Sequence, residues 1–227
     1  MNILDYAASV PTPADWTAAF QQAIADLRIR GGGTLIVPAG DYPTGAIRLY
    51  DNMTLHIESG AVLRFHQDAS AFPLIDLEFE GIAGLAHQPC IYAEHAKNVT
   101  ITGYGTLDGQ NHTITLDLTV DEGDNKDAAG LFQRLAGTVK NLTIDGRMEV
   151  QDRSIAVGGI AGIVCGEKTL ISHCRSDVDI YIEGSEMEAG GFVGMVDAGS
   201  LQISDSSMNG TINVDNSSSS YIAGLVG

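Results

Sequence analysis

Cysteine is scarce in this chain of 227 residues, which excludes the folds held together by disulfides. Its three cysteines, Cys90, Cys165 and Cys174, are too few and too scattered for a disulfide framework, and they have no metal-ligand spacing. We expect buried thiols. A pair between Cys165 and Cys174 stays open, because it needs a short Cα separation that a sequence does not give.

Basic residues are also few. Twelve Lys and Arg stand against 29 Asp and Glu, a formal charge of −17, which argues against nucleic acid and anionic membranes as partners. No run of about 18 apolar residues exists to span a bilayer, and residues 1–5 lack the basic and apolar regions of a signal peptide. We therefore expect the chain, as expressed, to be cytoplasmic.

One segment has the pattern of a helix. An apolar stripe runs along residues 13–30 at helical spacing, through Trp16, Phe20, Ala23, Ile24 and Leu27. We expect Thr12 as N-cap, Pro13 at the first helical position and Asp15 in the first turn, with Gly31-Gly32-Gly33 ending the helix.

The rest of the chain reads as short alternating strands. Apolar residues alternate with polar ones in several runs, at Ile47 and Leu49, Leu55 and Ile57, Leu63 and Phe65, Val99 and Ile101, and Ile114, Leu116, Leu118 and Val120. The C-terminal half repeats at one fixed interval, which separates Ile171 from Ile203 and recurs in Met148, Ile180 and Ile212, and in Val150, Ile182 and Val214.

Each repeat contains three strand-like pieces: a Gly-rich one (158–162, then 190–194), a middle one (170–172, then 202–204) and an alternating one (178–182, then 210–214). Three strands per repeat predict one three-sided coil of a β-solenoid. A degenerate earlier copy begins at Ala129, and an unfinished one begins at Ala223. The helix would cap the first coil; the last coil would leave an unpaired edge, so we expect self-association through that end.

Residues 1–110 resemble the opening of polygalacturonases, a family of glycoside hydrolases. The matching strings are Gly31–Tyr42, Thr44–Leu49, Leu55–Leu63, Ile91–Glu94 and Asn98–Gln110. The resemblance implies an all-β fold, a right-handed parallel β-helix with an N-terminal capping α-helix.

The later residues resemble a different group, the Gly-Leu-rich GLUG repeats of bacterial surface proteins. The strings Ala129–Phe132, Gly137–Ile144 and Ala223–Gly227 carry this resemblance, and Leu107-Asp108-Gly109 suits either group. We therefore predict two segments, 1–109 and 110–227, that share one β-helix as a natural or engineered chimera. The resemblance implies a secreted or cell-surface parent for the second segment.

The catalytic motifs of polygalacturonases are absent. Inverting hydrolysis needs two carboxyl groups, one as acid and one as base, and the family supplies them from Asn-Thr-Asp and Asp-Asp segments, assisted by Gly-His-Gly and Arg-Ile-Lys. None occurs here; Arg28-Ile29-Arg30 is only an echo in the helix, and Asp108 reads as a turn residue before glycine. We predict no catalytic residue, no cofactor and no enzyme activity.

Other polar groups read as structural. The acidic stretch 121–127 lacks the ligand spacing of a calcium loop, and Asp177 and Asp179 would point outward together from one strand, where they could bind a cation or form the polar face of that strand. The six histidines show no metal spacing: His56, His66, His87, His95, His112 and His173. Six Asn-x-Ser/Thr sequons, at Asn52, Asn98, Asn111, Asn141, Asn209 and Asn216, fit solenoid turns.

Three functions follow from these patterns. The first is a non-catalytic β-helix scaffold, and the second is a carbohydrate-binding or adhesive module, for which Tyr42, Tyr50, Tyr92 and Tyr104 would offer aromatic faces to a polysaccharide. The third is a polygalacturonase-like hydrolase with an unrecognised pair of acids.

Overall fold

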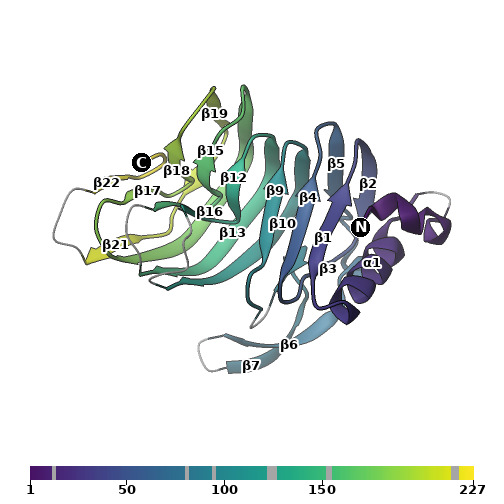
Figure 1. The fold of residues 1–227 in the computed structure, drawn as a ribbon. Helices are drawn as coiled ribbons and strands as arrows, with labels where there is room; N and C mark the ends of the chain where they lie inside the picture. Colours follow the sequence, from purple (N-terminus) through teal and green to yellow (C-terminus); the bar gives the residue numbers. More distant parts are fainter. Residues whose placement is uncertain (12–13, 80–81, 94–95, 122–126, 152–154, 216–219) are drawn as a thin grey trace.

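Parallel strand pairing organises the structure. The computed structural model describes residues 1–11, 14–79, 82–93, 96–121, 127–151, 155–215 and 220–227. Figure 1 shows an elongated stack of strands with helix α1 (Thr17–Ile29) across its N-terminal end. The chain is a right-handed parallel β-helix, as the sequence predicts, because each strand pairs in parallel with its counterpart one coil later.

Three faces of the stack are formed by separate sheets. The first contains β1 (Gly33–Val37), β4 (Met53–Ile57), β9 (Thr100–Gly103), β12 (Phe132–Leu135), β15 (Ala161–Val164) and β18 (Val193–Val196). The second, which we call the long-strand sheet, contains β2 (Gly40–Thr44), β5 (Ala61–Phe65), β10 (Thr106–Val120), β13 (Thr138–Val150), β16 (Thr169–Glu183), β19 (Leu201–Ser204), β20 (Ser207–Met208) and β21 (Ile212–Asp215). The third contains β11 (Ala128–Ala129), β14 (Ala156–Gly158), β17 (Glu188–Gly190) and β22 (Tyr221–Ala223), with β3 (Ile47–Arg48) and β8 (Ile91–Tyr92) pairing separately.

The sequence repeat sets the register of the C-terminal coils. Val139 pairs with Ile171, and Ile171 pairs with Ile203. Met148, Ile180 and Ile212 likewise form one ladder. These side chains point inward and pack in one apolar core that extends along the stack from Ile3 to Val193. The predicted ladders are confirmed.

The capping helix begins later than the sequence suggests. It starts at Thr17, and its N-cap is Trp16, which makes no side-chain capping bond. The Asp15 carboxylate does accept hydrogen bonds from the Thr17 backbone and hydroxyl, while Thr12 and Pro13 lie outside the described residues. A 3-10 helix, η1 (Ile3–Ser9), which the sequence analysis missed, packs beside α1 and is capped by Asn2.

The three pieces predicted within each repeat are divided differently in the structure. The middle and final pieces form one long strand, β16, which bends where His173 has a positive φ of 51°. Asn141 stands at the same bend one coil earlier, with a φ of 53°. The Gly-rich piece forms the corner between β14 and β15. Glycine is needed at this corner because a Cβ at Gly158 would lie 2.3 Å from the Ala161 carbonyl oxygen.

An antiparallel hairpin interrupts the second coil. Strands β6 (Leu74–Phe79) and β7 (Ile82–His87) pair antiparallel, after a short 3-10 helix, η2 (Ala69–Ala71). The hairpin projects from the side of the stack (Figure 1). The hairpin could not be predicted, because the sequence pattern of a short strand is the same for parallel and antiparallel pairing.

The coil that begins at β10 is larger than the first coil. Gly33 pairs with Met53 across the first coil, whereas Thr106 pairs with Thr138, which lies further along the chain. Only residues 106–108 of β10 pair with β5, so among the described strands the following segment pairs on one side alone, with β13. For this reason Leu116 and Leu118, the middle apolar residues of the predicted alternating run, pack against the core but are only partly buried. The sheets nevertheless continue through this step from β5 to β10 and β13.

The last described coil leaves apolar side chains at its surface. Tyr221, Ile222 and Leu225 are exposed there. Self-association through this end stays a prediction.

Candidate functional site

The outer face of the long-strand sheet carries polar residues in rows. Because side chains alternate along a strand, the residues between the inward ladders all point outward. In register across the coils, Thr115 faces Asp145 and then Asp177, and Asp117 faces Arg147 and then Asp179. This face is therefore a grid of carboxylates, hydroxyls and guanidinium groups.

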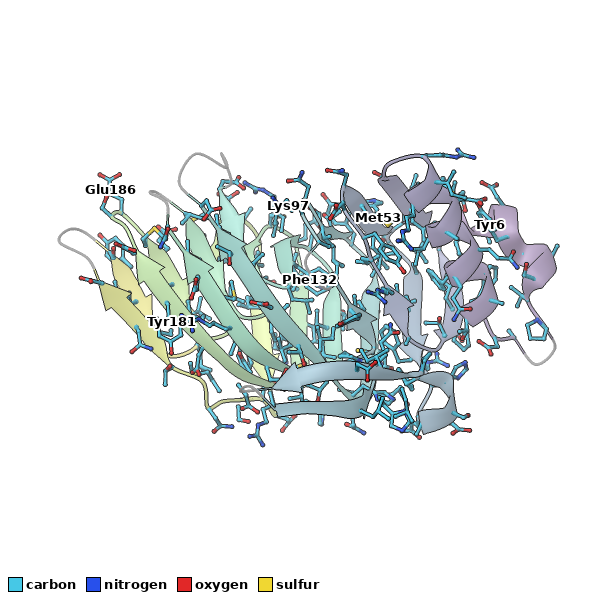
Figure 2. The ribbon with its side chains drawn as sticks, turned by 90° about the horizontal axis from the view of Figure 1, so that it is seen from below. Tyr6, Met53, Lys97, Phe132, Tyr181 and Glu186 are labelled. Atoms are coloured by element: carbon cyan, nitrogen blue, oxygen red, sulfur yellow. The ribbon has the colours of Figure 1, made fainter. Side chains whose placement is uncertain are left out.

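A groove of about 440 Å³ lies at one end of this face, and we call it the Tyr181 groove. The Tyr181 ring is 38% exposed and lies in register between Glu149 and Asn213. Figure 2 views the molecule from below and labels Tyr181 on this sheet, toward the end of the stack opposite α1. The polar groups that line the groove with Tyr181 are Arg147, Glu149, Gln151, Glu183, Asn213 and Asp215.

Interactions between neighbouring coils hold these groups in place. The Arg147 guanidinium carbon lies 4.4 Å from the centroid of the Tyr181 ring, and Arg147 also forms an ion pair with Glu149. The Gln151 amide donates to the Glu183 carboxylate at 3.1 Å. An aromatic ring among fixed hydrogen-bonding groups is the combination that suits a sugar ring.

Tyr181 is not among the aromatic residues that the sequence indicated for a sugar-binding surface. Its position was visible in the alternating strand 178–182, where Ile180 and Ile182 point inward and Tyr181 must point outward. The aromatic residues that were selected do not gather on one wall. Tyr42 is buried against Trp16, Tyr50 and Tyr92 flank Arg48, and Tyr104 is exposed in a turn.

Asp177 and Asp179 do point outward from one strand, as predicted, and both bond to neighbours. Asp177 accepts from the Arg175 guanidinium at 2.8 Å and from the Asn209 amide at 3.2 Å. The hydrogen bonds from Arg175 lower the pKa of Asp177. Asp179 accepts from the Thr211 backbone and hydroxyl. These bonds favour the polar-face interpretation over a cation site.

Asp108 is the most buried of the described carboxylates and lies at the bulge of β10. Its Oδ2 lies 3.0 Å from Lys140 Nζ, and its Oδ1 accepts from the Asn141 amide at 3.0 Å and the Gln110 backbone at 3.3 Å. Burial alone would raise the pKa of Asp108, but the bonds from Asn141, Lys140 and Gln110 outweigh it and lower the pKa. A carboxyl in this state stays ionised and anchors a turn.

Histidines and asparagines hold local structure. His66 Nε2 lies 3.1 Å from Asp15 Oδ1, and His87 Nδ1 lies 2.7 Å from the Phe72 carbonyl oxygen. Four of the sequon asparagines have a positive φ: Asn52 and Asn98 between strands, and Asn111 and Asn141 within β10 and β13. The Asn98 amide donates to Asn52 one coil below it. His95, Asn216 and residues 122–126 lie outside the described part of the chain.

The three thiols are unpaired. Cys90 and Cys174 are buried, as expected, and Cys165 is half-buried. Burial raises the pKa of Cys90 to about 12 and that of Cys174 to about 11. Within the described residues, no group of three or more His, Cys, Asp or Glu side chains is arranged to hold a metal ion.

A second groove, of about 570 Å³, follows the step at β10. Its apolar lining includes Leu49, Val99, Leu116 and Leu118, and its polar lining includes Lys97 and Asp117. It lies where most of β10 pairs with no described strand of the preceding coil. Across the ranges that the structure describes, no helix is long and apolar enough to cross a bilayer.

Comparisons with known proteins connect the N-terminal half to polygalacturonases. No family model matches the chain. A probable polygalacturonase of Vitis vinifera is 38% identical over 103 residues, covering 41% of this chain and 21% of the relative. The chain thus matches about a fifth of that relative's length. The resemblance of the N-terminal half to polygalacturonases is confirmed.

Two solved structures are similar at lower identity. A proposed glycosyl hydrolase from Parabacteroides merdae is 18% identical, with a TM-score of 0.44, 92% of this chain covered and 97% of that one. A hyperthermoactive exopolygalacturonase from Thermotoga maritima is also 18% identical, with a TM-score of 0.48, 98% of this chain covered and 68% of that one.

Proposed function

We propose that this chain is a non-catalytic β-helix scaffold. The state of its carboxyl groups supports this proposal. Glycoside hydrolysis needs a carboxylic acid whose pKa is raised, so that it still holds a proton to donate. The most buried described carboxylate, Asp108, is bonded to Lys140 and Asn141, and the outward Asp177 is bonded to Arg175; these bonds lower the pKa of both groups.

A hydrolase assay tests the proposal. Incubation with polygalacturonate between pH 4 and pH 8 is expected to release no reducing sugar above the level of a heat-denatured sample. A commercial polygalacturonase serves as positive control. Release that disappears in Asp177→Asn or Asp179→Asn protein would overturn the scaffold proposal and establish the polygalacturonase-like alternative, which the name of the Vitis relative supports.

Carbohydrate binding at the Tyr181 groove is our second candidate function. The exposed Tyr181 ring, surrounded by fixed amide and carboxylate groups, is the observation that favours it. Three carboxylates, Glu149, Glu183 and Asp215, stand against one cation, Arg147, in the lining. Because like charges repel, we expect this groove to prefer neutral oligosaccharides to uronates.

Replacement of Tyr181 by alanine tests this binding. A glycan array with neutral and pectic oligosaccharides first identifies a ligand, and calorimetry then measures its Kd. Loss of the ring is expected to weaken binding at least about tenfold, or about 1.4 kcal/mol. Tyr221→Ala is the matched control, because Tyr221 is 72% exposed and lies outside the groove. Equal Kd values for the two variants would contradict a site at Tyr181.

We also propose that residues 1–109 and 110–227 are β-helical fragments of different origin, the second related to GLUG repeats. The change of coil length supports this proposal. In the first segment the register advance is uneven, from Gly33 to Met53 across the first coil and from Thr54 to Thr100 across the second, which contains the β6–β7 hairpin. From β10 on it is regular along the long-strand sheet, from Thr106 to Thr138 and from Thr138 to Leu170. The step falls where the polygalacturonase-like strings end, at residues 107–109.

A further inference from the structure

The edge of β10 beyond its bulge is open among the described strands. Residues 106–108 pair with β5 on one side and β13 on the other, but residues 112–120 pair with β13 alone. The groove of about 570 Å³ lies along this edge, and we call it the β10 groove. An unpaired strand edge is a template on which another strand can pair.

The backbone groups that face the β10 groove follow from two hydrogen bonds. The Val120 carbonyl accepts from the Gln151 N–H, on the side of β13. The Thr113 carbonyl accepts from the Cys90 thiol at 3.7 Å, on the side of the preceding coil. Because backbone groups alternate in direction along a strand, every second residue after Thr113 also turns its N–H and C=O toward the preceding coil. These residues are Thr115, Asp117 and Thr119. No described residue forms a hydrogen bond with these backbone groups.

The side chains along this edge indicate what kind of strand would fit. Leu116 and Leu118 point inward, line the groove and are only partly buried. On the outer face, Asp117 is exposed and forms no ion pair with a described residue. Asp121 is a second exposed carboxylate of the lining, which also contains Lys97. A strand with apolar side chains on its inner face and basic ones on its outer face would complement this edge.

We propose that the β10 groove binds an extended peptide in which apolar and basic residues alternate. The peptide backbone would pair with the open N–H and C=O groups of β10 and add a strand to the long-strand sheet. Its apolar side chains would pack on Leu116 and Leu118, and a basic side chain would pair with Asp117. The net charge of −17 favours a cationic peptide over a second copy of this chain, because like charges repel. The inference goes beyond the scaffold proposal and does not involve the Tyr181 groove.

Fluorescence anisotropy with designed peptides tests the proposal on the full chain. The probe is a labelled peptide of alternating lysine and valine, as long as the segment from Thr113 to Thr119. One control has glutamate in place of lysine. Two others keep the side chains of the probe but carry N-methyl groups, either on the valines or on the lysines, because a strand paired with β10 turns only one of these sets of N–H groups toward it.

We expect saturable binding of the probe, and at least tenfold weaker binding of the glutamate peptide and of one methylated peptide. The proposal fails if the probe does not bind saturably or if the glutamate peptide binds equally well. It also fails if both methylated peptides bind as tightly as the probe, because the backbone of the peptide then does not pair with β10.

Variants of the full chain locate the site, with circular dichroism confirming that they fold. Thr115→Pro removes an N–H from the open edge but no bond to β13, and is expected to weaken probe binding at least tenfold. Thr115→Val is its matched control, because it keeps the N–H and should change the affinity less than twofold. If Thr115→Pro does not fold, the methylated peptides make the same test on the wild-type chain.

The charge contribution has its own pair of variants. Asp117→Asn is expected to weaken probe binding at least threefold. Glu167→Gln is the control, because it removes the same charge from an exposed residue outside the groove lining. Equal losses in these two variants would show general electrostatic attraction and overturn the proposal. A dimer in light scattering that Thr115→Pro dissociates would also overturn it, because a second copy would then occupy the edge.

Discussion

Truncation of Leu107 to alanine is expected to destabilise the folded chain by about 2–5 kcal/mol. Leu107 is 1% exposed and stands in register between Leu63 of β5 and Val139 of β13. The truncation removes the contacts of Leu107 with the core and leaves a cavity. Strand pairing on both sides holds the neighbouring side chains in place, so they do not move in to fill this cavity. Urea denaturation, followed by circular dichroism and by Trp16 fluorescence, measures the loss.

The same experiment tests whether the two ends of the stack unfold together in one cooperative transition. Trp16 reports on the N-terminal end, whereas circular dichroism reports mainly on the strands of the whole stack. Neighbouring coils stabilise each other, so both signals should shift to lower urea together. A shift in one signal alone would contradict a coupled stack. Leu85→Ala is the control, because Leu85 is 69% exposed on the hairpin and should cost less than about 0.5 kcal/mol.

Replacement of Asp108 by alanine is the second change with a large expected effect, a loss of about 2–4 kcal/mol at pH 7. It would leave the Asn141 amide and the Gln110 backbone without their acceptor and Lys140 without its counter-ion. The expected loss is below the full range for a buried pair, because Lys140 is 39% exposed and water replaces part of its interaction.

The effect of Asp108 depends on pH in a predictable direction. Its folded-state pKa is lowered below the ordinary value of 3.8. The ionised carboxylate therefore stabilises the fold fully above pH 3.8, and this contribution is lost as the pH falls through the folded-state pKa. We expect the stability difference between wild type and Asp108→Asn to be constant from pH 7 to about 5 and to shrink at pH 3.

Urea denaturation at pH 7, 5, 4 and 3 measures this difference. Asp41→Asn is the control for a surface ion pair, because Asp41 is 51% exposed and bonds to Arg64. Its effect should stay within about 1 kcal/mol at pH 7. A difference for Asp108→Asn that grows as the pH falls would contradict the assigned hydrogen bonds.

Much of the fold could be predicted from the sequence, because its evidence is periodic. Residues one repeat apart, such as Ile171 and Ile203, share a ladder, and period-two alternation settles which side chains point inward. The Trp16–Leu27 stripe predicted the capping helix. The predicted start of this helix was too early, because tertiary contacts fix the start, including a hydrogen bond from the Trp16 N–H to the Pro43 carbonyl. Within one repeat, a bent strand and two strands have the same pattern, so β16 could not be distinguished from two pieces.

The candidate sites were less predictable than the fold. Tyr181 was not predicted as a site residue, since its neighbours Arg147 and Asn213 come from the coils before and after it, on β13 and β21.

The sequence by itself determined the repeat length, the inward ladders and the helical cap. These features depend on residues that are close along the chain or one fixed period apart. Only the tertiary structure decided the antiparallel hairpin, the step at β10 and the Tyr181 groove. The physical reason is that a groove is formed by side chains from several coils, and its shape depends on how coils of different length stack, which no single repeat encodes.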